Sequence, residues 1–173
     1  MDLEKIKKLR EATGAPIIEC RAALSEAKGN EKKALEILRK KGLEKAAEVK
    51  EREEGKEGLI DAYIHLNGKI GVLIEVNCET DFVAKTKDFK ELVHDLCLQI
   101  AATNPLYISP LEIPKEVLAK EDDNEAFIQR VCLLKQPFIK DQSKTVEDII
   151  SEKIAKLKEN ITIKRFARFE LGG

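Results

Sequence analysis

The sequence has no tryptophan, and aromatic residues make up only 5% of its 173 residues. Proteins that bind single-stranded nucleic acid stack the bases on aromatic side chains, so this composition offers few stacking platforms. Neither charge is in excess, because 31 basic and 32 acidic residues leave a formal net charge of −1. A dedicated nucleic-acid-binding domain is normally strongly basic. We therefore expect no direct nucleic-acid partner.

Long apolar runs are also missing. No stretch approaches the roughly 18 apolar residues that indicate a transmembrane helix, and the opening residues MDLEKIKKLR lack the apolar region of a secretory signal peptide. The cysteines are widely spaced and form no C-x-x-C pair: Cys20, Cys78, Cys97 and Cys132. This usage is typical of reduced, buried thiols rather than of disulfides or a zinc site. We expect a cytoplasmic protein without a membrane partner.

Catalytic signatures are absent as well. There is no G-x-S-x-G or H-E-x-x-H motif, and the Gly68–Lys69 pair lacks the remaining residues of a phosphate-binding loop. His65 and His94 lie on different predicted elements without partner motifs, so a structural or surface role explains them better than catalysis. Cys78 is better explained as an unreactive, buried thiol than as a redox-sensitive one. The sequence predicts no enzyme, no metal site and no cofactor.

Three short helices are predicted over residues 1–42. Gly29 can end the second helix in a left-handed conformation, Asn30 can cap the third, and Gly42 ends the third. A bundle this small is marginal alone and suits a docking module. The mostly charged residues 43–57 predict an exposed helical linker.

Residues 58–173 are expected to form a core domain that begins with a hairpin. Apolar residues alternate at positions 60 to 66 and again at 70 to 76, on either side of Asn67–Gly68. A two-residue loop would place the two apolar rows on opposite faces, whereas a three-residue loop from Leu66 to Gly68 would bring them together. Because a slip of one residue turns a whole apolar row toward water, we expect the three-residue loop.

A helical pattern follows the hairpin. Its apolar stripe consists of Phe89, Leu92, Val93, Leu96 and Ile100. Prolines interrupt residues 105–142, where we expect short helices at 114–120 and 124–135.

The remaining pattern predicts another helix and a third strand. Thr145 and Asp148 resemble a capping box that opens an amphipathic helix. Apolar residues then alternate over residues 161–171. Because strands and helices are segregated along the chain, the predicted class is α+β, with a three-stranded antiparallel sheet and packed helices.

The stretch ETDFVAKTKDF, residues 79–89, joins the second strand to the long helix. Thr80 can cap that helix, and Asp81 suits its positive end. Phe82 precedes Phe89 by seven residues, a spacing that returns to nearly the same helical face with a drift of about 20°. If the helix is continuous from Thr80, Phe82 belongs to the core, and periodicity favours this interpretation. If a tight loop comes first, Phe82 protrudes at the corner.

Several stretches resemble one known protein family. In chain order they are TGAPIIECRAAL (13–24), EVNCETDFVA (75–84), CLLKQPF (132–138), SKTVED (143–148) and ENITIKRF (159–166). Together they resemble bacterial and organellar elongation factor Ts, the exchange factor for the translational GTPase elongation factor Tu. The resemblance covers nearly the whole chain, and TDFVA is its most specific part.

The resemblance implies contact residues in two places. The N-terminal bundle would be like a ubiquitin-associated module that docks on the nucleotide domain of elongation factor Tu, with Ile17 and Ile18 as an apolar contact pair. Ile17 shares a helix stripe with Leu24, so a core role is the alternative for it, and Ile18 is the better contact candidate. The segment that intrudes near the Mg²⁺-binding side of the partner's nucleotide site matches Thr80, Asp81, Phe82 and Val83.

The resemblance also implies a homodimer. The chain lacks a long second half and a coiled coil, as the short family type does, and that type pairs as a homodimer. Two departures from the family stand out. The region between Leu118 and Val131 is short, whereas members have a longer helical excursion there. Lys158 stands where many members carry glycine, so we expect no glycine-dependent close approach at that position.

The function implied is to promote GDP release from elongation factor Tu by disturbing its Mg²⁺ and phosphate site, without covalent chemistry. Asp81 could act on the partner or only cap its own helix. The alternative function is that of a non-catalytic, ribosome-associated adaptor or chaperone with a ubiquitin-associated-like module, which would bind its partner without accelerating nucleotide release.

Overall fold

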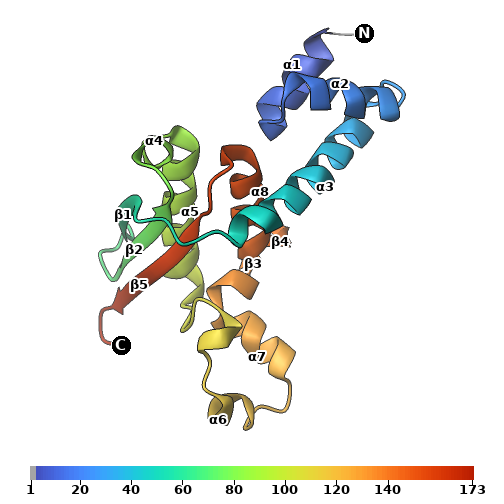
Figure 1. The fold of residues 1–173 in the computed structure, drawn as a ribbon. Helices are drawn as coiled ribbons and strands as arrows, with labels where there is room; N and C mark the ends of the chain where they lie inside the picture. Colours follow the sequence, from blue (N-terminus) through green and yellow to red (C-terminus); the bar gives the residue numbers. More distant parts are fainter. Residues whose placement is uncertain (1–2) are drawn as a thin grey trace. The chain divides into compact units, whose positions relative to one another are not determined.

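The computed structural model describes residues 3–173, which divide into two compact units. Of these residues, the first unit comprises 3–53 and Ser151–Asn160, and the second comprises Glu54–Ile150 and Ile161–Gly173. Figure 1 shows the N-terminal helices of the first unit in blue and cyan, and the three longest strands of the second in green and red.

A bundle of three helices forms most of the first unit. They are α1 (Leu3–Thr13), α2 (Ile17–Glu26) and α3 (Glu31–Lys50). Gly29 takes a φ of 82° after α2, and Asn30 caps α3 by accepting a 3.1 Å hydrogen bond from the backbone N–H of Lys33. The buried core comprises Ile6, Leu9, Cys20, Ala23, Leu24, Ala27, Ala34 and Leu38. The three predicted N-terminal helices and both of these helix boundaries are confirmed.

Helix α3 continues through Gly42, so the prediction that it ends there is wrong. The added turns bury two apolar side chains, Ala46 and Val49. A Cβ at residue 42 would lie 3.3 Å from the Ala155 methyl group, so the missing side chain allows a close helix contact. Gly42 alone disfavours a helix, but burial of Ala46 and Val49 after it stabilises the additional turns.

The end of α3 is tied to the second chain segment of the first unit. The side-chain amide of Asn160 donates a 3.0 Å hydrogen bond to the Arg52 carbonyl oxygen. The functional division into a docking module at 1–42, a linker at 43–57 and a core and dimerisation domain at 58–173 stays a prediction.

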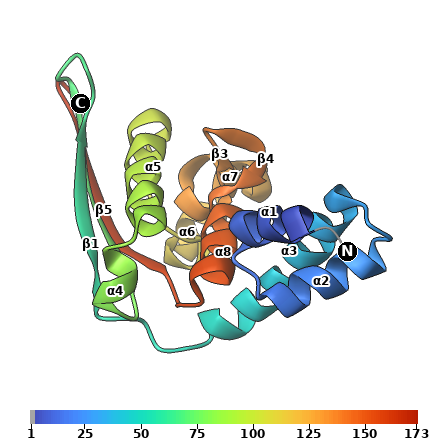
Figure 2. The same ribbon diagram turned by 90° about the horizontal axis from the view of Figure 1, so that it is seen from above.

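The second unit is built on a three-stranded antiparallel sheet. Its strands are β1 (Glu57–Ile64), β2 (Ile70–Cys78) and β5 (Thr162–Glu170), in the order β1-β2-β5. Helix α5 (Lys87–Thr103) covers one face of this sheet (Figure 2) and buries the predicted stripe of Phe89, Leu92, Val93, Leu96 and Ile100. The predicted α+β class with a three-stranded antiparallel sheet is confirmed.

The register of the hairpin differs from the prediction. Ile64 lies opposite Gly71, which is the register of the two-residue loop. The turn is closed by a 2.7 Å hydrogen bond from the Gly68 N–H to the His65 carbonyl, and Gly68 takes a φ of 68°. The expected three-residue loop is therefore wrong, because the argument for it assumed that both apolar rows face one core.

The two apolar rows consequently lie on opposite faces of the sheet. The β2 row of Val72, Ile74 and Val76 is buried on the side of α5, and the β1 row faces away from it. An irregularity in the pairing of β5, between Glu75 and Val76 of β2, also splits the third apolar row. As a result, Phe169 of β5 lies opposite Gly71, on the same face as the β1 row.

We call this second surface of the sheet the open face. Its apolar residues are Ile60, Ala62, Ile64, Leu73, Ala167 and Phe169. In Figure 2, no other element of residues 54–150 or 161–173 covers it.

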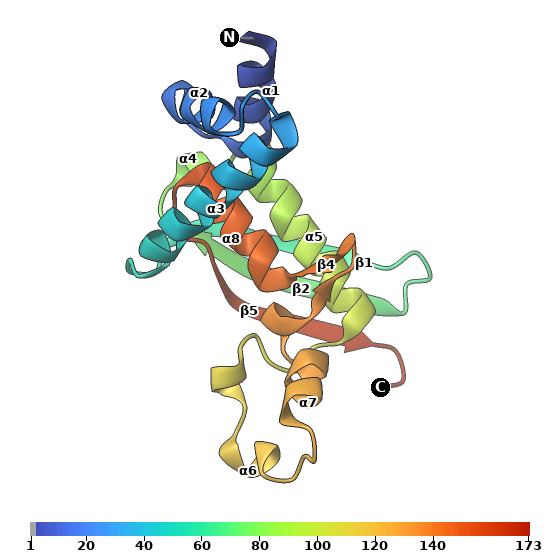
Figure 3. The ribbon, with the colours of Figure 1, turned by 90° about the vertical axis from the view of Figure 1, so that its right-hand side faces the viewer.

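Residues 105–135 form an arm with a small apolar cluster of its own (Figure 3). The arm contains α6 (Lys115–Leu118), α7 (Asn124–Val131) and two 3₁₀ turns, Pro110–Glu112 and Leu133–Lys135. The buried cluster is Ile113, Phe127, Val131 and Cys132. The two short helices expected in this region are confirmed, although both are shorter than predicted.

A buried glutamine connects α5 to the segment that follows the arm. Gln99 donates to the Pro137 carbonyl at 3.1 Å and accepts from the Ile139 N–H at 2.8 Å. These residues belong to a small hairpin of β3 (Pro137–Phe138) and β4 (Asp141–Thr145), which the sequence did not predict. The side-chain amide thus pairs backbone groups that a two-residue strand leaves open.

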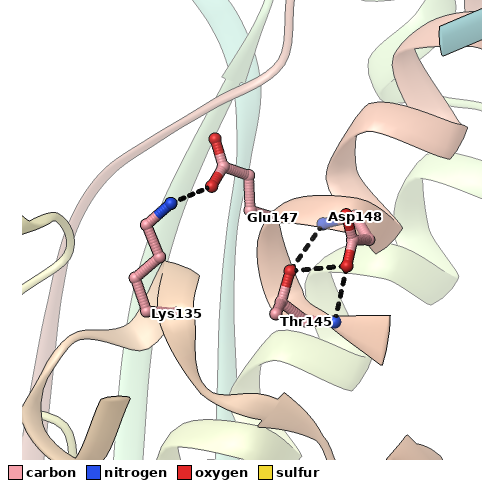
Figure 4. A network of polar contacts seen from close by, with 4 residues as sticks. All are labelled: Lys135, Thr145, Glu147 and Asp148. Atoms are coloured by element: carbon pink, nitrogen blue, oxygen red, sulfur yellow. Dashed lines mark hydrogen bonds and ion pairs between the residues drawn. The ribbon is translucent and has the colours of Figure 1, made fainter. Parts of the chain in front are cut away.

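The capping box at the start of α8 (Val146–Leu157) is confirmed (Figure 4). Asp148 accepts 2.8 Å hydrogen bonds from the Thr145 N–H and hydroxyl, and its own N–H donates to the Thr145 hydroxyl at 3.2 Å. The bond from the Thr145 backbone lowers the pKa of Asp148 below its ordinary value. Beyond the helix, Lys158 takes a φ of 63°, which glycine adopts more easily.

All four cysteines are buried thiols outside any disulfide, as predicted. None of the helices in residues 3–173 combines the length and the apolar character that crossing a membrane requires.

Replacing Asp148 with alanine should lower the free energy of unfolding by about 1 kcal/mol at neutral pH, because the capping box is lost. The folded-state pKa of Asp148 is lowered, so its contribution is complete above the ordinary value of 3.8 and disappears as the pH falls through the folded value. Urea unfolding across this pH range should show the two proteins converging in acid.

The control is Glu147→Ala, which removes an exposed ion pair with Lys135, 2.6 Å long, and should cost less. A cost of Asp148→Ala that stays constant down to the lowest pH would contradict the assignment.

Candidate functional site

The corner between β2 and α5 contains its own short helix, α4 (Asp81–Ala84). Thr80 has extended backbone angles and accepts a 3.4 Å hydrogen bond from the Val83 N–H, so it caps this helix. Its carbonyl oxygen lies 3.2 Å from the Sγ of Cys78, which is fully buried. The start of the corner is therefore attached to the last residue of a central strand.

A second threonine ends the corner. Thr86 is also extended, with a ψ of 150°, and caps α5 by accepting a 3.2 Å hydrogen bond from the Phe89 N–H. Its hydroxyl donates to the Val83 carbonyl at 2.7 Å. Two helices therefore begin within seven residues, one after each threonine.

Phe82 lies on the outer side of α4, with 79% of its surface exposed. Phe89, at the start of α5, is fully buried. The expectation from periodicity, that Phe82 belongs to the core, is wrong because α4 and α5 are not one continuous helix. The other interpretation of the sequence, a ring that protrudes at a corner, describes the structure.

Asp81 does not cap α4, since Thr80 does. Its carboxylate instead pairs with Lys85 one turn later, at 2.5 Å. The hydrogen bond from Lys85 lowers the pKa of Asp81, and the same bond raises the pKa of Lys85. Because both side chains are well exposed, this pair adds little to stability, and it places a charged pair on the same short helix as Phe82.

The backbone behind the corner is closely packed. A Cβ at Gly55 would lie 1.9 Å from the carbonyl oxygen of Cys78, so only a glycine fits in this arrangement. Ala84, on the inner side of α4, is buried, and Val83 is partly buried. Phe82 therefore points outward from a closely packed backbone, which restricts the movement of the corner.

The apolar pair in the first unit opens helix α2. Ile17 is 50% exposed and Ile18 is 80% exposed. Leu24, which was predicted to share a stripe with Ile17, is buried. The greater exposure of Ile18 agrees with its choice as the better contact candidate, although the structure does not test the contact itself.

Thr86 was not among the predicted site residues. The signal was present, because a threonine three residues before the first stripe residue, with Asp88 in the first turn, indicates a helix start. Thr80, six residues earlier, gives the same signal, so the sequence alone indicates two possible starts for the helix.

The two histidines take part in surface contacts. His65 Nδ1 lies 3.0 Å from the hydroxyl of Tyr63, and His94 pairs with Asp61 at 3.5 Å. Among residues 3–173, no three His, Cys, Asp or Glu side chains are grouped so that they could hold a metal ion.

Comparison with known proteins gives a consistent result. The family model described as elongation factor TS matches residues 42–126 and 123–173. The elongation factor Ts of Moorella thermoacetica is 50% identical over 190 aligned positions, covering 96% of this chain and 93% of the relative. That of Thermotoga maritima is 47% identical, covering 99% of this chain and 96% of the relative.

These matches place the chain among the translation elongation factors. Within that class, it belongs to the elongation factor Ts family.

The comparisons also show that this chain is shortened. The Moorella alignment has 190 positions against the 173 residues here, so at least 17 positions of the alignment have no counterpart in this chain. The two matched ranges meet at residues 123–126, where α7 begins. This agrees with the expectation that the region between Leu118 and Val131 lacks part of a longer helical excursion.

Phe82→Ala should change the free energy of unfolding by less than about 0.5 kcal/mol, because the ring is exposed. Phe89→Ala is the matched comparison and should cost about 3–5 kcal/mol, because that ring is fully buried. Urea unfolding of both variants measures the difference. Similar large losses in the two would show that Phe82 is packed inside its own chain.

Proposed function

We propose that this chain promotes GDP release from elongation factor Tu in the cytoplasm, by inserting the α4 corner next to the partner's Mg²⁺ and phosphate site. The observation that carries the proposal is the exposed Phe82 ring on a corner capped at both ends. Membership of the elongation factor Ts family supports it. The activity requires no covalent step and no cofactor of the chain's own.

The physical requirement is a difference in affinity between two states of the partner. The chain must bind the nucleotide-free state more tightly than the GDP state, and by linkage GDP must weaken the chain by the same factor. Magnesium needs near-ideal octahedral oxygen ligands, so a small displacement of its surroundings weakens the bound nucleotide. An apolar ring that occupies part of this polar site has that effect.

A preformed corner suits this task. Ordering a flexible loop on binding would use up part of the binding free energy, whereas Thr80 and Thr86 hold the backbone before the partner arrives. Asp81, paired with Lys85, offers polar groups beside the ring that can compete for the partner's donors. In this proposal Thr80 and Val83 support the ring, and Asp81 and Phe82 make the contact.

Docking is assigned to the first unit. Ile18, with Ile17 beside it, provides an exposed apolar contact on the ubiquitin-associated-like bundle. This contact would hold the partner equally well with and without nucleotide. It therefore contributes to affinity, whereas the corner contributes to release.

Phe82→Ala should lower the maximal rate of stimulated GDP release roughly tenfold, which corresponds to about 1.4 kcal/mol of lost stabilisation. Ile18→Ala should instead raise the half-saturating concentration and leave the maximal rate unchanged, because it removes uniform binding. Release of labelled GDP from elongation factor Tu, measured against increasing concentrations of each variant, separates the two effects.

Leu111→Ala is the control, because this side chain is 95% exposed and lies on the arm. An unchanged maximal rate for Phe82→Ala would exclude the corner as the acting element. If the wild-type chain binds elongation factor Tu and does not accelerate release at all, the adaptor alternative is correct.

We further propose that the chain forms a homodimer through the open face. Ile60, Ile64 and Phe169 are 59%, 65% and 71% exposed, although all three belong to regular, paired strands. A hollow over Gly71, between Ile64 and Phe169, could accept a side chain from a second copy. The apolar part of this face can pack on the same part of a second copy across a two-fold axis, with strand directions within about 30° of each other.

Phe169→Glu should convert the dimer into a monomer, because it places an unpaired charge in the apolar interface. Sedimentation equilibrium over a range of concentrations measures the change. Leu111→Glu, an equally drastic substitution on the arm, should leave the dimer intact. The proposal fails if Phe169→Glu still forms dimers, or if the wild type is monomeric throughout.

A further inference from the structure

The outward position of Phe82 depends on a break between two helices that the local sequence does not otherwise demand. Helix α4 ends at Ala84 and α5 begins at Lys87. Between them only Thr86 departs from helical angles, since Lys85 has a φ of −83° and a ψ of −13°. The stretch contains no proline or glycine that would impose a break.

The hydroxyl of Thr86 stabilises the break from both sides. It donates to the Val83 carbonyl at 2.7 Å, which satisfies an acceptor at the end of α4. It accepts from the Phe89 N–H at 3.2 Å, which satisfies a donor at the start of α5. The Thr86 N–H also donates to Val83, at 3.0 Å. Backbone groups that a helix break would leave open are thus paired by one residue.

Without the break, the geometry would favour a different position for the ring. In one continuous helix, Phe82 would return to nearly the face of Phe89, with a drift of about 20°. Phe89 is fully buried, and burial of a second ring is favourable. The hydrophobic effect therefore favours turning Phe82 inward, and the hydrogen bonds of Thr86 oppose it.

We propose that Thr86 is a positioning residue that keeps Phe82 exposed by holding α4 and α5 apart. The inference rests on the proposed function for its biological meaning, but the geometric claim can be tested without elongation factor Tu. It assigns a role to a residue outside the Thr80–Val83 segment, acting through Phe82 rather than on the partner.

The chain offers a clean reporter, because it has no tryptophan. Phe82→Trp in the full-length chain places a single indole at the corner, whose emission and acrylamide quenching report its exposure. In this background, Thr86→Ala should shift the emission to shorter wavelength and reduce quenching. Thr86→Ser and Thr86→Asn keep a capping group and should leave both signals unchanged.

Asp123→Ala is the matched control. Asp123 caps α7 by accepting a 3.0 Å hydrogen bond from the Ala126 N–H, so the variant loses the same kind of cap in the same unit. It should lower the unfolding midpoint about as much as Thr86→Ala without changing the indole signal. A loss of stability alone therefore cannot produce the expected spectrum.

Exchange is measured separately in chains that keep Phe82. Thr86→Ala should lower the maximal rate of GDP release about as much as Phe82→Ala, roughly tenfold. Thr86→Ser should restore it, and Asp123→Ala should leave it unchanged.

An indole that stays exposed in Thr86→Ala overturns the inference, whatever happens to the exchange rate. An indole that turns inward while exchange stays at the wild-type rate supports the positioning role of Thr86 and counts against the proposed function of Phe82. If Thr86→Ala does not fold, the Ser and Asn variants still decide, because loss of exposure in either of them contradicts capping as the cause.

Discussion

Two hydrogen bonds of the Thr86 hydroxyl separate helix α4 from helix α5, and the position of the Phe82 ring depends on that separation. Leaving an aromatic ring in water forgoes about as much free energy as burying one apolar core side chain would contribute. It remains outside here because the backbone between β2 and α5 is paired at each step, by Thr80 at the start and by Thr86 at the end. The corner is thus a rigid support rather than a loop that orders on binding.

Two apolar surfaces of the second unit are not covered by other elements of that unit: the α4 corner and the open face of the sheet. The same principle explains both. Regular, paired backbone keeps these apolar side chains in water, and binding to a partner would bury them and lower the free energy. The corner is small and sits beside a charged pair, which suits entry into a polar site. The open face extends over three strands and suits a second sheet. The apolar pair in the first unit adds a third contact region, so binding, nucleotide release and dimerisation are assigned to different side chains.

The features that the sequence predicted correctly are local. The Asn30 cap and the capping box of Thr145 and Asp148 depend on residues within one turn, and the stripe of α5 depends on a single period. Two errors arose where contacts between residues distant in sequence determine the end of a helix or the register of a strand. Helix α3 passes Gly42 because a second segment packs against it, and the hairpin register follows from an apolar row that faces outward instead of inward.

The candidate site differs, because the error there arose from a local feature. The identity of the Thr80–Val83 segment came from family resemblance, and its capping threonine from local chemistry. The exposure of Phe82 could not be predicted from its spacing to Phe89, because one residue between them interrupts the helix. A pattern of seven residues indicates a shared face only if the backbone between is continuous.

The most direct test of the account is the coupling between the chain and the nucleotide on elongation factor Tu. The dissociation constant of the wild-type chain should be measured with nucleotide-free elongation factor Tu and with its GDP·Mg²⁺ complex, and both measurements repeated for Phe82→Ala. The account predicts a large ratio of the two constants for the wild type and a ratio much closer to one for Phe82→Ala, because the ring is the main group that opposes bound nucleotide. If the variant binds both states more weakly and the ratio is unchanged, Phe82 is an ordinary contact residue and the account is contradicted.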